Sequence, residues 1–255
     1  MMSEDNLLVV RGIRKTFGGL VALDDVNIVI KKKLIVMLIG PNGSGKTTLI
    51  NVISGTYKPD KGRIQFGDRD ITGWTADKVC KSGLIRTYQI PQLFLNLTVL
   101  ENILMAYKEN PGMGFLKASI KKTWIKKEEE ATEKAFMILK AVELDNMWDK
   151  RASELSGGQM KLLETGRALM SGAKLILMDE PAAGIFPTLI DKLFSHFVEL
   201  KKKFGVTFLV VEHRLDPVLP YVDYVYALDK GKIISEGKAN KVLNDPRIIE
   251  SYLGE

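Results

Sequence analysis

One glycine-rich segment limits what this chain can fold into more than any other feature. Residues 40–47 read Gly-Pro-Asn-Gly-Ser-Gly-Lys-Thr, which fits the phosphate-loop pattern G-x-x-x-x-G-K-[ST]. Such a loop needs a buried strand before it and a helix after it. The apolar run Leu34–Ile39 precedes the loop, and residues 47–54 read as a helix that Gly55 ends. The segment therefore predicts an α/β fold with a phosphate site at the carboxyl end of a strand.

The residue types in this loop are those that phosphate binding requires. Glycines allow tight turns, so several backbone N–H groups can point at phosphate oxygens, and the helix beginning near Lys46 adds the positive end of its dipole. Lys46 is predicted to bridge the terminal phosphates, and the Thr47 hydroxyl is predicted to hold Mg²⁺. The predicted nucleotide site comprises Gly40, Pro41, Asn42, Gly43, Ser44, Gly45, Lys46, Thr47 and Thr48.

Two adjacent carboxylates end a second predicted strand. Asp179 and Glu180 follow the apolar run 175–178, and ligands of open α/β sheets lie beyond the carboxyl ends of the strands. Asp179 is expected to reach Mg²⁺ directly or through water. Glu180 is expected to polarise an attacking water as a general base, an effect typically worth about 10²–10⁴-fold in rate. The alternative is that Glu180 only caps the loop that follows.

The segment Ser156-Gly157-Gly158-Gln159 has two interpretations. Ser-x-x-Gln is a capping box, in which Ser156 caps a helix and Gln159 reaches back to it, and apolar residues at helical spacing follow in 162–170. A cap alone does not need two glycines in its first turn, because each costs about 1 kcal/mol relative to alanine. Their presence favours close approach by a ligand, and an open helix N-terminus is an anion site.

Composition excludes several classes of protein. The chain has 255 residues, of which 45% are hydrophobic and 27% charged, and its net charge is +6. This is an ordinary globular balance, and the lysine runs 31–33 and 201–203 are expected on solvated faces, so no nucleic-acid partner is predicted. The single cysteine, Cys80, fits a reducing cytosol. We find no signal-peptide pattern and no apolar run approaching the roughly 20 residues that span a bilayer, so membrane association is expected only through another chain.

The order of predicted elements divides the chain into a core and an insertion. Short strands at 7–10, 26–30 and 62–66 predict an antiparallel layer near the N-terminus, and strands alternate with helices again after residue 174. Between them, residues 126–144 have one apolar helical face, and 110–122 read as a surface insertion. We predict one domain over 1–255, with a mostly parallel α/β core formed by about 1–90 and 171–255 and a helical subdomain at about 91–170.

In this order, the two glycine motifs resemble the nucleotide-binding domain of ATP-binding cassette (ABC) proteins. The resemblance implies a P-loop NTPase cassette, with a RecA-like core, an N-terminal antiparallel β layer and an inserted helical subdomain. It implies that ATP and Mg²⁺ bind at the phosphate loop. It also implies that the signature segment Ser156, Gly157, Gly158 and Gln159 contacts the γ-phosphate of ATP held by a second ABC subunit, the same or paralogous, in a head-to-tail dimer.

The same resemblance assigns roles to three further residues. Gln89, in Arg-Thr-Tyr-Gln, matches the Q-loop residue that senses Mg²⁺ and γ-phosphate. His213, in Val-Val-Glu-His, matches the switch histidine that contacts γ-phosphate, and Phe17 matches the aromatic residue that stacks on adenine. Phe186 stands where the family usually has an aspartate, whose hydrogen bonds an apolar ring cannot make. The expected catalytic residues are Glu180, His213 and Gln89, and the expected Mg²⁺ ligands are Thr47, Gln89 and Asp179.

Within the family the chain looks most like the ATPase subunits of prokaryotic branched-chain amino-acid importers. Such a subunit is cytoplasmic and peripheral on the inner face of the cell membrane, where it drives permease subunits and, indirectly, serves an extracytoplasmic substrate-binding protein. The segments that carry this likeness are 17–23, 86–89, 93–94, 180–184, the insertion near 110–127, and 252–254. Several are shared with ATPases for urea or amide uptake and for lipopolysaccharide-type export, which remain alternatives.

Two other classes are weighed against a transport ATPase. Soluble ABC ATPases that act on ribosomes, DNA or protein clusters commonly have two cassettes or long coiled-coil insertions, and this chain has neither. A P-loop kinase would need an acceptor pocket, and that function would not explain the signature segment.

Overall fold

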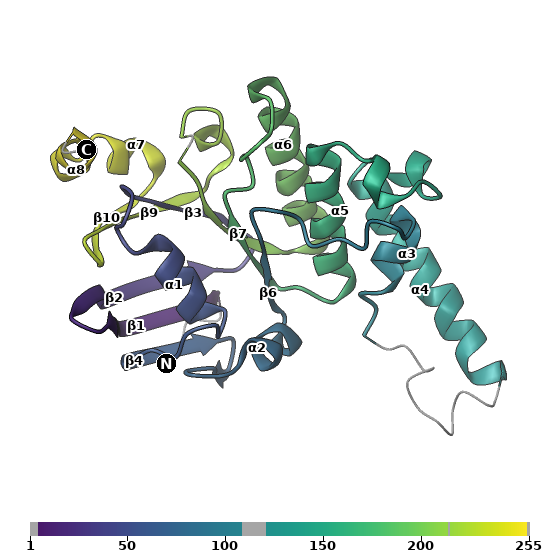
Figure 1. The fold of residues 1–255 in the computed structure, drawn as a ribbon, viewed down its shortest axis with the longest axis horizontal. Coiled ribbons are helices and arrows are strands. Elements are labelled where there is room, and N and C mark those ends of the chain that lie inside the picture. The colour runs from purple at the N-terminus through teal and green to yellow at the C-terminus, as the bar shows by residue number, and fades with distance from the viewer. Residues whose placement is uncertain (1–4, 109–120, 214, 254–255) are drawn as a thin grey trace. The chain divides into compact units, whose positions relative to one another are not determined.

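The larger of two structural units contains both β-sheets. The computed structural model describes residues 5–108, 121–213 and 215–253. Its first unit comprises residues 1–89 and 174–255, and its second comprises residues 90–173 (Figure 1). Among the described residues, no helix combines the length and apolar character that a membrane span needs.

An antiparallel sheet forms the N-terminal part of the first unit, as predicted. Its strand order is β2-β1-β4-β5. In β2, the alternate residues Val26, Ile28 and Ile30 are buried while their neighbours are exposed, because one face of the sheet covers the core. The strands are β1 (Asn6–Phe17), β2 (Leu20–Lys31), β4 (Lys61–Phe66) and β5 (Arg69–Asp70). The first runs well past the predicted 7–10, since its polar second half pairs with both neighbours.

A second sheet of six strands, in the order β10-β9-β3-β8-β7-β6, forms the core of the same unit. Its central strands β3 and β8 are apolar apart from Thr207, because both faces of a parallel sheet are covered. Every residue of β3 and β8 is buried. The strands are β3 (Ile35–Ile39), β6 (Leu84–Thr87), β7 (Leu175–Asp179), β8 (Thr207–Val211), β9 (Tyr224–Asp229) and β10 (Lys232–Gly237), the last two forming an antiparallel hairpin.

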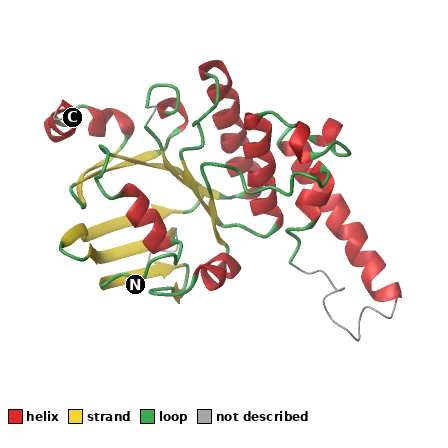
Figure 2. Ribbon diagram, viewed as in Figure 1, coloured by secondary structure: helices red, strands yellow, loops and turns green. Residues whose placement is uncertain are grey.

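In the first unit, helices connect successive strands or follow the last one along the chain (Figure 2). The longest, α6, has Pro187 in its first turn and ends at Gly205, whose φ of 66° is left-handed. Ile190, Phe194 and Phe197 lie on its buried face. The elements are α1 (Lys46–Ile53), α2 (Ala76–Ser82), α6 (Pro187–Phe204), α7 (Ala239–Leu243), α8 (Pro246–Leu253) and the 3₁₀ turn η4 (Leu219–Tyr221).

The second unit is helical. Gly166 lets its helices approach closely, since a Cβ there would lie 2.8 Å from Ile103 Cδ1 and 3.2 Å from Ile138 Cγ2. The predicted apolar face is confirmed: Ala131, Ala135, Ile138, Leu139 and Val142 are buried. The elements are α3 (Val99–Leu104), α4 (Lys121–Ala141), α5 (Gly157–Met170), η2 (Asp145–Met147) and η3 (Ala152–Glu154).

The helix predicted at 126–144 is displaced at both ends. It begins at Lys121 and stops at Ala141, before the left-handed Glu143, whose φ is 54°. Most of the predicted insertion at 110–122 lies outside the described residues.

Candidate functional site

The predicted phosphate loop joins β3 to α1, and two of its glycines are required by close packing. A Cβ at Gly40 would lie 2.0 Å from the Leu228 carbonyl oxygen, and one at Gly45 would lie 2.6 Å from the Ala22 carbonyl oxygen. Both glycines have positive φ, of 151° and 109°. The loop is therefore held against β9 on one side and β2 on the other, and no residue with a side chain fits at either position.

The side chains of the loop face inward. Lys46 is buried, and its Nζ donates hydrogen bonds to the carbonyl oxygens of Gly40 and Pro41, both at 2.8 Å. The Ser44 hydroxyl is also buried and has no hydrogen-bond partner within the described residues. Gly45 gives α1 no side-chain cap. A buried cation, a buried hydroxyl and an uncapped helix N-terminus form a donor set that fits phosphate oxygens.

Glu180 lies at the end of β7 in an unusual backbone conformation. Its φ is 49°, in the left-handed region that costs a non-glycine residue about 1–3 kcal/mol and that recurs at functional sites. Its N–H donates to the Val211 carbonyl oxygen at 2.9 Å, which ties the turn to β8. The backbone is thus fixed where the carboxylate must be aimed.

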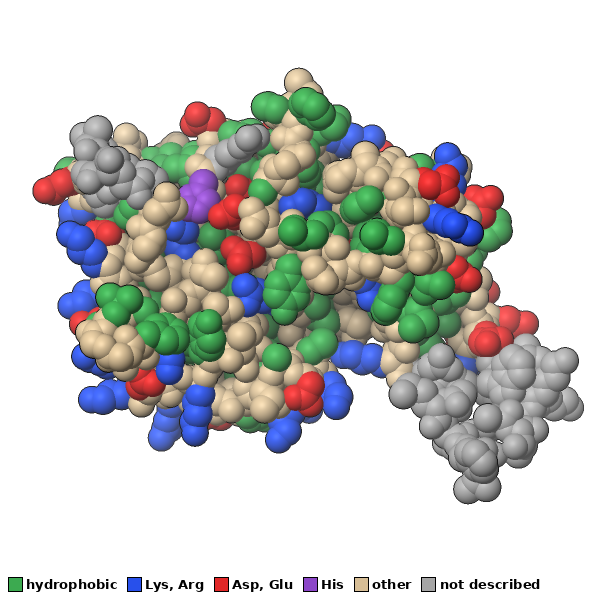
Figure 3. Space-filling view, in the orientation of Figure 1, with side chains coloured by type: hydrophobic (Ala, Val, Ile, Leu, Met, Phe, Trp, Pro, Cys, Tyr) green, Lys and Arg blue, Asp and Glu red, His purple; other side chains and the backbone are tan. Residues whose placement is uncertain are grey.

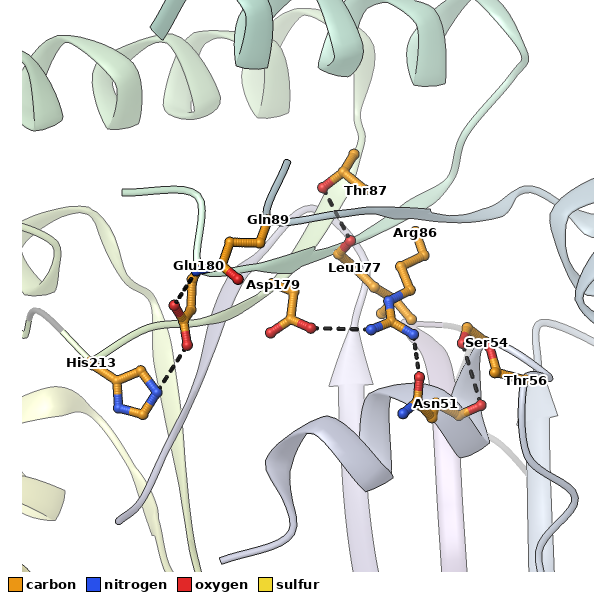
Figure 4. A network of polar contacts seen from close by, with 10 residues as sticks. All are labelled: Asn51, Ser54, Thr56, Arg86, Thr87, Gln89, Leu177, Asp179, Glu180 and His213. Carbon is orange, nitrogen blue, oxygen red and sulfur yellow. Dashed lines mark hydrogen bonds and ion pairs between the residues drawn. The ribbon is translucent and has the colours of Figure 1, made fainter. Parts of the chain in front are cut away.

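Two residues predicted from the resemblance converge on this carboxylate (Figure 4). The Gln89 Nε2 donates to Glu180 Oε2 at 3.1 Å, and His213 Nε2 lies 3.1 Å from Glu180 Oε1. The His213 side chain is 40% exposed, and on the face shown in Figure 3 a histidine lies at the surface beside acidic side chains. The structure therefore brings Gln89, Glu180 and His213 together, although they are far apart in the sequence.

Phe17 is the last residue of β1, at the tip of the hairpin that β1 forms with β2. Its side chain is 41% exposed, and its ring meets the Tyr57 ring edge-on, with the centroids 5.3 Å apart. Ala22 of the same hairpin is the residue whose carbonyl abuts Gly45. The exposed Phe17 ring and the backbone contact to the phosphate loop thus lie on the same hairpin.

The signature segment lies in the second unit and forms the predicted capping box of α5. The Ser156 Oγ accepts from the Gln159 N–H at 3.4 Å, and the Ser156 N–H donates to Gln159 Oε1 at 2.9 Å. A Cβ built at Gly157 or Gly158 meets no atom of the described residues within 4 Å. Packing inside the chain therefore does not explain why these two positions are glycine.

Comparison with known proteins decides the family. The ABC transporter family model matches residues 23–183. The chain belongs to this family. It is therefore a nucleotide-binding ATPase cassette, with the α/β fold that the sequence predicted.

Relatives and solved structures match almost the whole chain. It is 49% identical to a probable branched-chain amino acid transport ATP-binding protein LivG of Archaeoglobus fulgidus, over 97% of this chain and 95% of that protein. A protein of the same name from Methanocaldococcus jannaschii is also 49% identical, over 100% of both chains. The ADP conformation of an ATP-binding cassette of an ABC transporter is 48% identical, with a TM-score of 0.84 over 98% of this chain and 99% of that one. A dimeric post-hydrolysis cassette bound to ADP and Pi is 25% identical, with a TM-score of 0.71 over 91% and 98%.

Arg86 is a charged residue of the cassette to which the sequence assigned no separate role. Its Nη2 lies 3.1 Å from Asp179 Oδ2, and its Nη1 donates to Asn51 Oδ1 on α1 (Figure 4). Its guanidinium also lies 5.0 Å from the Tyr88 ring centroid. The Arg86 side chain is only 11% exposed. The guanidinium therefore neutralises the Asp179 carboxylate and ties it to α1. The available signal was its place three residues before Gln89, in the segment that the resemblance singled out.

Glu212 is a second such residue. It is buried, and its carboxylate accepts hydrogen bonds from the Ala182 N–H and, at 3.2 Å, from the His213 N–H. One acidic side chain thus joins the loop after Glu180 to the backbone of the histidine. The sequence signal was a carboxylate directly after the apolar run of β8.

Phe186, where the resemblance leads one to expect aspartate, caps no N–H group of α6 and is 76% exposed. The ring makes none of the hydrogen bonds that a carboxylate at a helix N-terminus provides.

Proposed function

We propose that this cassette is the ATP-hydrolysing subunit of a membrane importer of branched-chain amino acids. The observation that carries the ATPase assignment is the convergence of Gln89 and His213 on Glu180, directly after a strand of the sheet whose strand β3 leads into the phosphate loop. The cargo is supported by the names of the two relatives that are 49% identical along nearly the whole chain.

ATP is proposed to bind along residues 40–48, with the adenine against Phe17. Lys46 would then exchange its two carbonyl partners for oxygens of the terminal phosphates, and the buried Ser44 hydroxyl would gain an acceptor. Thr47, Gln89 and Asp179 offer the hydroxyl, amide and carboxylate oxygens that Mg²⁺ prefers. When bound, Mg²⁺ neutralises charge on the β- and γ-phosphate oxygens.

Hydrolysis is proposed to depend on Glu180. Its carboxylate accepts the proton of a water whose oxygen attacks the γ-phosphorus, while the bond from that phosphorus to the bridging oxygen breaks and ADP leaves. In the arrangement shown, both carboxylate oxygens are engaged, by Gln89 and His213. We propose that His213 turns to the γ-phosphate, which leaves Glu180 Oε1 open to the attacking water.

A second cassette is proposed to complete each site in a head-to-tail dimer. The segment Ser156, Gly157, Gly158 and Gln159 would present the N-terminus of α5 to the γ-phosphate held by the partner. Open space at both glycines supports this, and so does the dimeric state of the related cassette bound to ADP and Pi. The chain is proposed to be one cassette over 1–255, with a core at about 1–90 and 171–255 and a helical subdomain at about 91–170.

The partners that follow from this function are permease subunits and, indirectly, an extracytoplasmic substrate-binding protein. The cassette would lie on the cytoplasmic face of the membrane, and motion at Gln89 would pass through the following segment to the permease. ATPases for urea or amide import and for lipopolysaccharide-type export are the alternatives for cargo and direction.

Purification from the native cell tests the transport assignment. The Glu180→Gln chain, tagged and captured with ATP from detergent-solubilised membranes, should bring two permeases that mass spectrometry identifies. The reconstituted complex of the natural chain should then release phosphate faster when a leucine-loaded binding protein is added. Stimulation by a urea-loaded binding protein alone would replace the proposed cargo. Recovery only from the soluble fraction with ribosomes or nucleic acid would contradict the transport function.

A further inference from the structure

The connection between α1 and β4 touches the end of β1 at two points. The Tyr57 ring packs edge-on against Phe17, with an interplanar angle of 72°. The Asp60 Oδ2 accepts hydrogen bonds from the Thr16 N–H at 2.6 Å and from the Thr16 hydroxyl at 2.7 Å, while its Oδ1 accepts from Lys15 Nζ at 3.0 Å. All of these contacts fall on the last three residues of β1.

Asp60 acts where a strand partner is missing. β4 begins at Lys61, which pairs with Arg14 of β1, and the Asp60 N–H donates to the Arg14 carbonyl oxygen at 2.9 Å. Beyond this point β4 does not continue beside β1. The Asp60 carboxylate supplies the next acceptor, for the N–H of Thr16. The end of β1 is therefore fixed by a side chain at the edge where the backbone ladder stops.

Lys15 connects the carboxylate to the aromatic ring. Its Nζ lies 5.3 Å from the Phe17 ring centroid, within the range of a cation–π contact, and also bonds Asp60. The Thr16 hydroxyl and then Lys15 lower the pKa of the Asp60 carboxyl to about 2. The carboxylate therefore keeps its charge, and its three hydrogen bonds, throughout the neutral range.

We infer that Asp60 and Tyr57 are positioning residues for adenine, which hold the end of β1 so that the Phe17 ring is in place before the base arrives. The inference rests on the proposed function, in which Phe17 stacks on the adenine of ATP. If the Phe17 ring became ordered only when adenine bound, the free-energy cost of that ordering would weaken the binding of ATP. This loss would fall only on ligands that carry a base, because the triphosphate contacts belong to residues 40–48.

The test compares two ligands, ATP and inorganic triphosphate, each with Mg²⁺, by calorimetric titration of the full chain. Removing an aromatic ring on which a base stacks typically weakens binding about 5- to 150-fold, the change expected for ATP with Phe17→Ala. Asp60→Ala should weaken ATP binding about 2- to 10-fold, the range for ordering one side chain, and leave triphosphate binding within about twofold. Tyr57→Leu should act in the same direction.

Asp70→Ala is the matched control. Asp70 is an exposed aspartate of β5, at the far edge of the same sheet, and it accepts from the Thr72 N–H at 2.9 Å. Its removal should leave the ratio of the two affinities unchanged. If Asp60→Ala does not fold, Asp60→Asn, which keeps one acceptor for Thr16, and Tyr57→Leu test the same ratio.

Three results would overturn the inference, and they are distinguishable from a failure of the proposed function. Equal weakening of both ligands by the Asp60 variant, or unchanged ATP binding, means that Asp60 does not position the platform. Unchanged ATP binding with Phe17→Ala overturns the inference as well, but places the fault in the adenine assignment itself.

Discussion

The phosphate loop and the signature segment both place glycines at the start of a helix, yet the surroundings of these glycines differ. At Gly40 and Gly45 a Cβ would collide with the backbone of neighbouring strands, whereas at Gly157 and Gly158 it would meet nothing. The first pair of glycines is needed by the fold of the single chain. The second pair is not, which points to a requirement that arises only when something else approaches. The glycines that the single chain needs for its fold thus differ from those for which we propose a role in assembly.

The largest expected effect isolates hydrolysis from binding. Glu180→Gln keeps the shape of the side chain and removes the base, so phosphate release should fall by about 10²–10⁴-fold while the ATP dissociation constant changes little. Glu199→Gln, an exposed carboxylate of α6, should leave both unchanged. Normal phosphate release by the Glu180 variant would remove this residue from the role of base.

A substitution at Gly40 tests the folding half of the comparison. Gly40→Ala places a methyl group 2.0 Å from the Leu228 carbonyl oxygen, at positive φ. The free energy of unfolding in urea should therefore fall by more than about 1 kcal/mol, without any nucleotide present. A variant as stable as the natural chain would show that the close packing of this loop is not required.

Arg86→Gln tests whether one guanidinium links Asp179, at the carboxyl end of β7, to α1. The substitution leaves Asp179 without its cation and weakens the link to Asn51, so the free energy of unfolding should fall by about 1–3 kcal/mol. ATP with Mg²⁺ should restore more stability to this variant than to the natural chain, since a metal ion would supply the missing positive charge. Equal stabilisation of both chains by ATP and Mg²⁺ would argue against a metal at Asp179.

The smallest expected change in stability has the opposite sign. Gly158→Ala replaces a helix glycine in open space, so the free energy of unfolding should stay the same or rise by up to about 1 kcal/mol. ATP hydrolysis should nevertheless fall, because the methyl group occupies the surface offered to the partner. Gly166→Ala in the same helix is the contrast: its Cβ would lie 2.8 Å from Ile103 Cδ1 and 3.2 Å from Ile138 Cγ2, so this variant should be less stable than Gly158→Ala.

What the sequence predicted well depends on local pattern. The strand, loop and helix around Lys46 follow from an apolar run, glycines and a helix stop, and the capping box at Ser156 follows from four adjacent residues. The meeting of Gln89 and His213 at Glu180 was expected only through the family resemblance. Their catalytic roles remain predictions.

The contacts that the sequence did not predict depend on the register between neighbouring strands of the sheet that are far apart in the sequence. Arg86 reaches Asp179 because β6 pairs with β7 so that Arg86 lies opposite Leu177. Glu212 reaches Ala182 because β8 runs beside β7. Neither contact has a local sequence pattern. The sequence therefore indicates that Arg86 and Glu212 are charged residues in or directly after apolar segments, but it does not indicate which residues they contact.

The most direct test of the account is the mass of the Glu180→Gln chain in solution, measured by light scattering with and without ATP and Mg²⁺. We predict a monomer that becomes a dimer when ATP is added, and a double variant with Gly158→Leu that binds ATP but stays monomeric. A Glu180→Gln chain that binds ATP tightly and remains a monomer, or a dimer that the Gly158 substitution does not affect, would contradict the claim that the signature segment completes the partner's site.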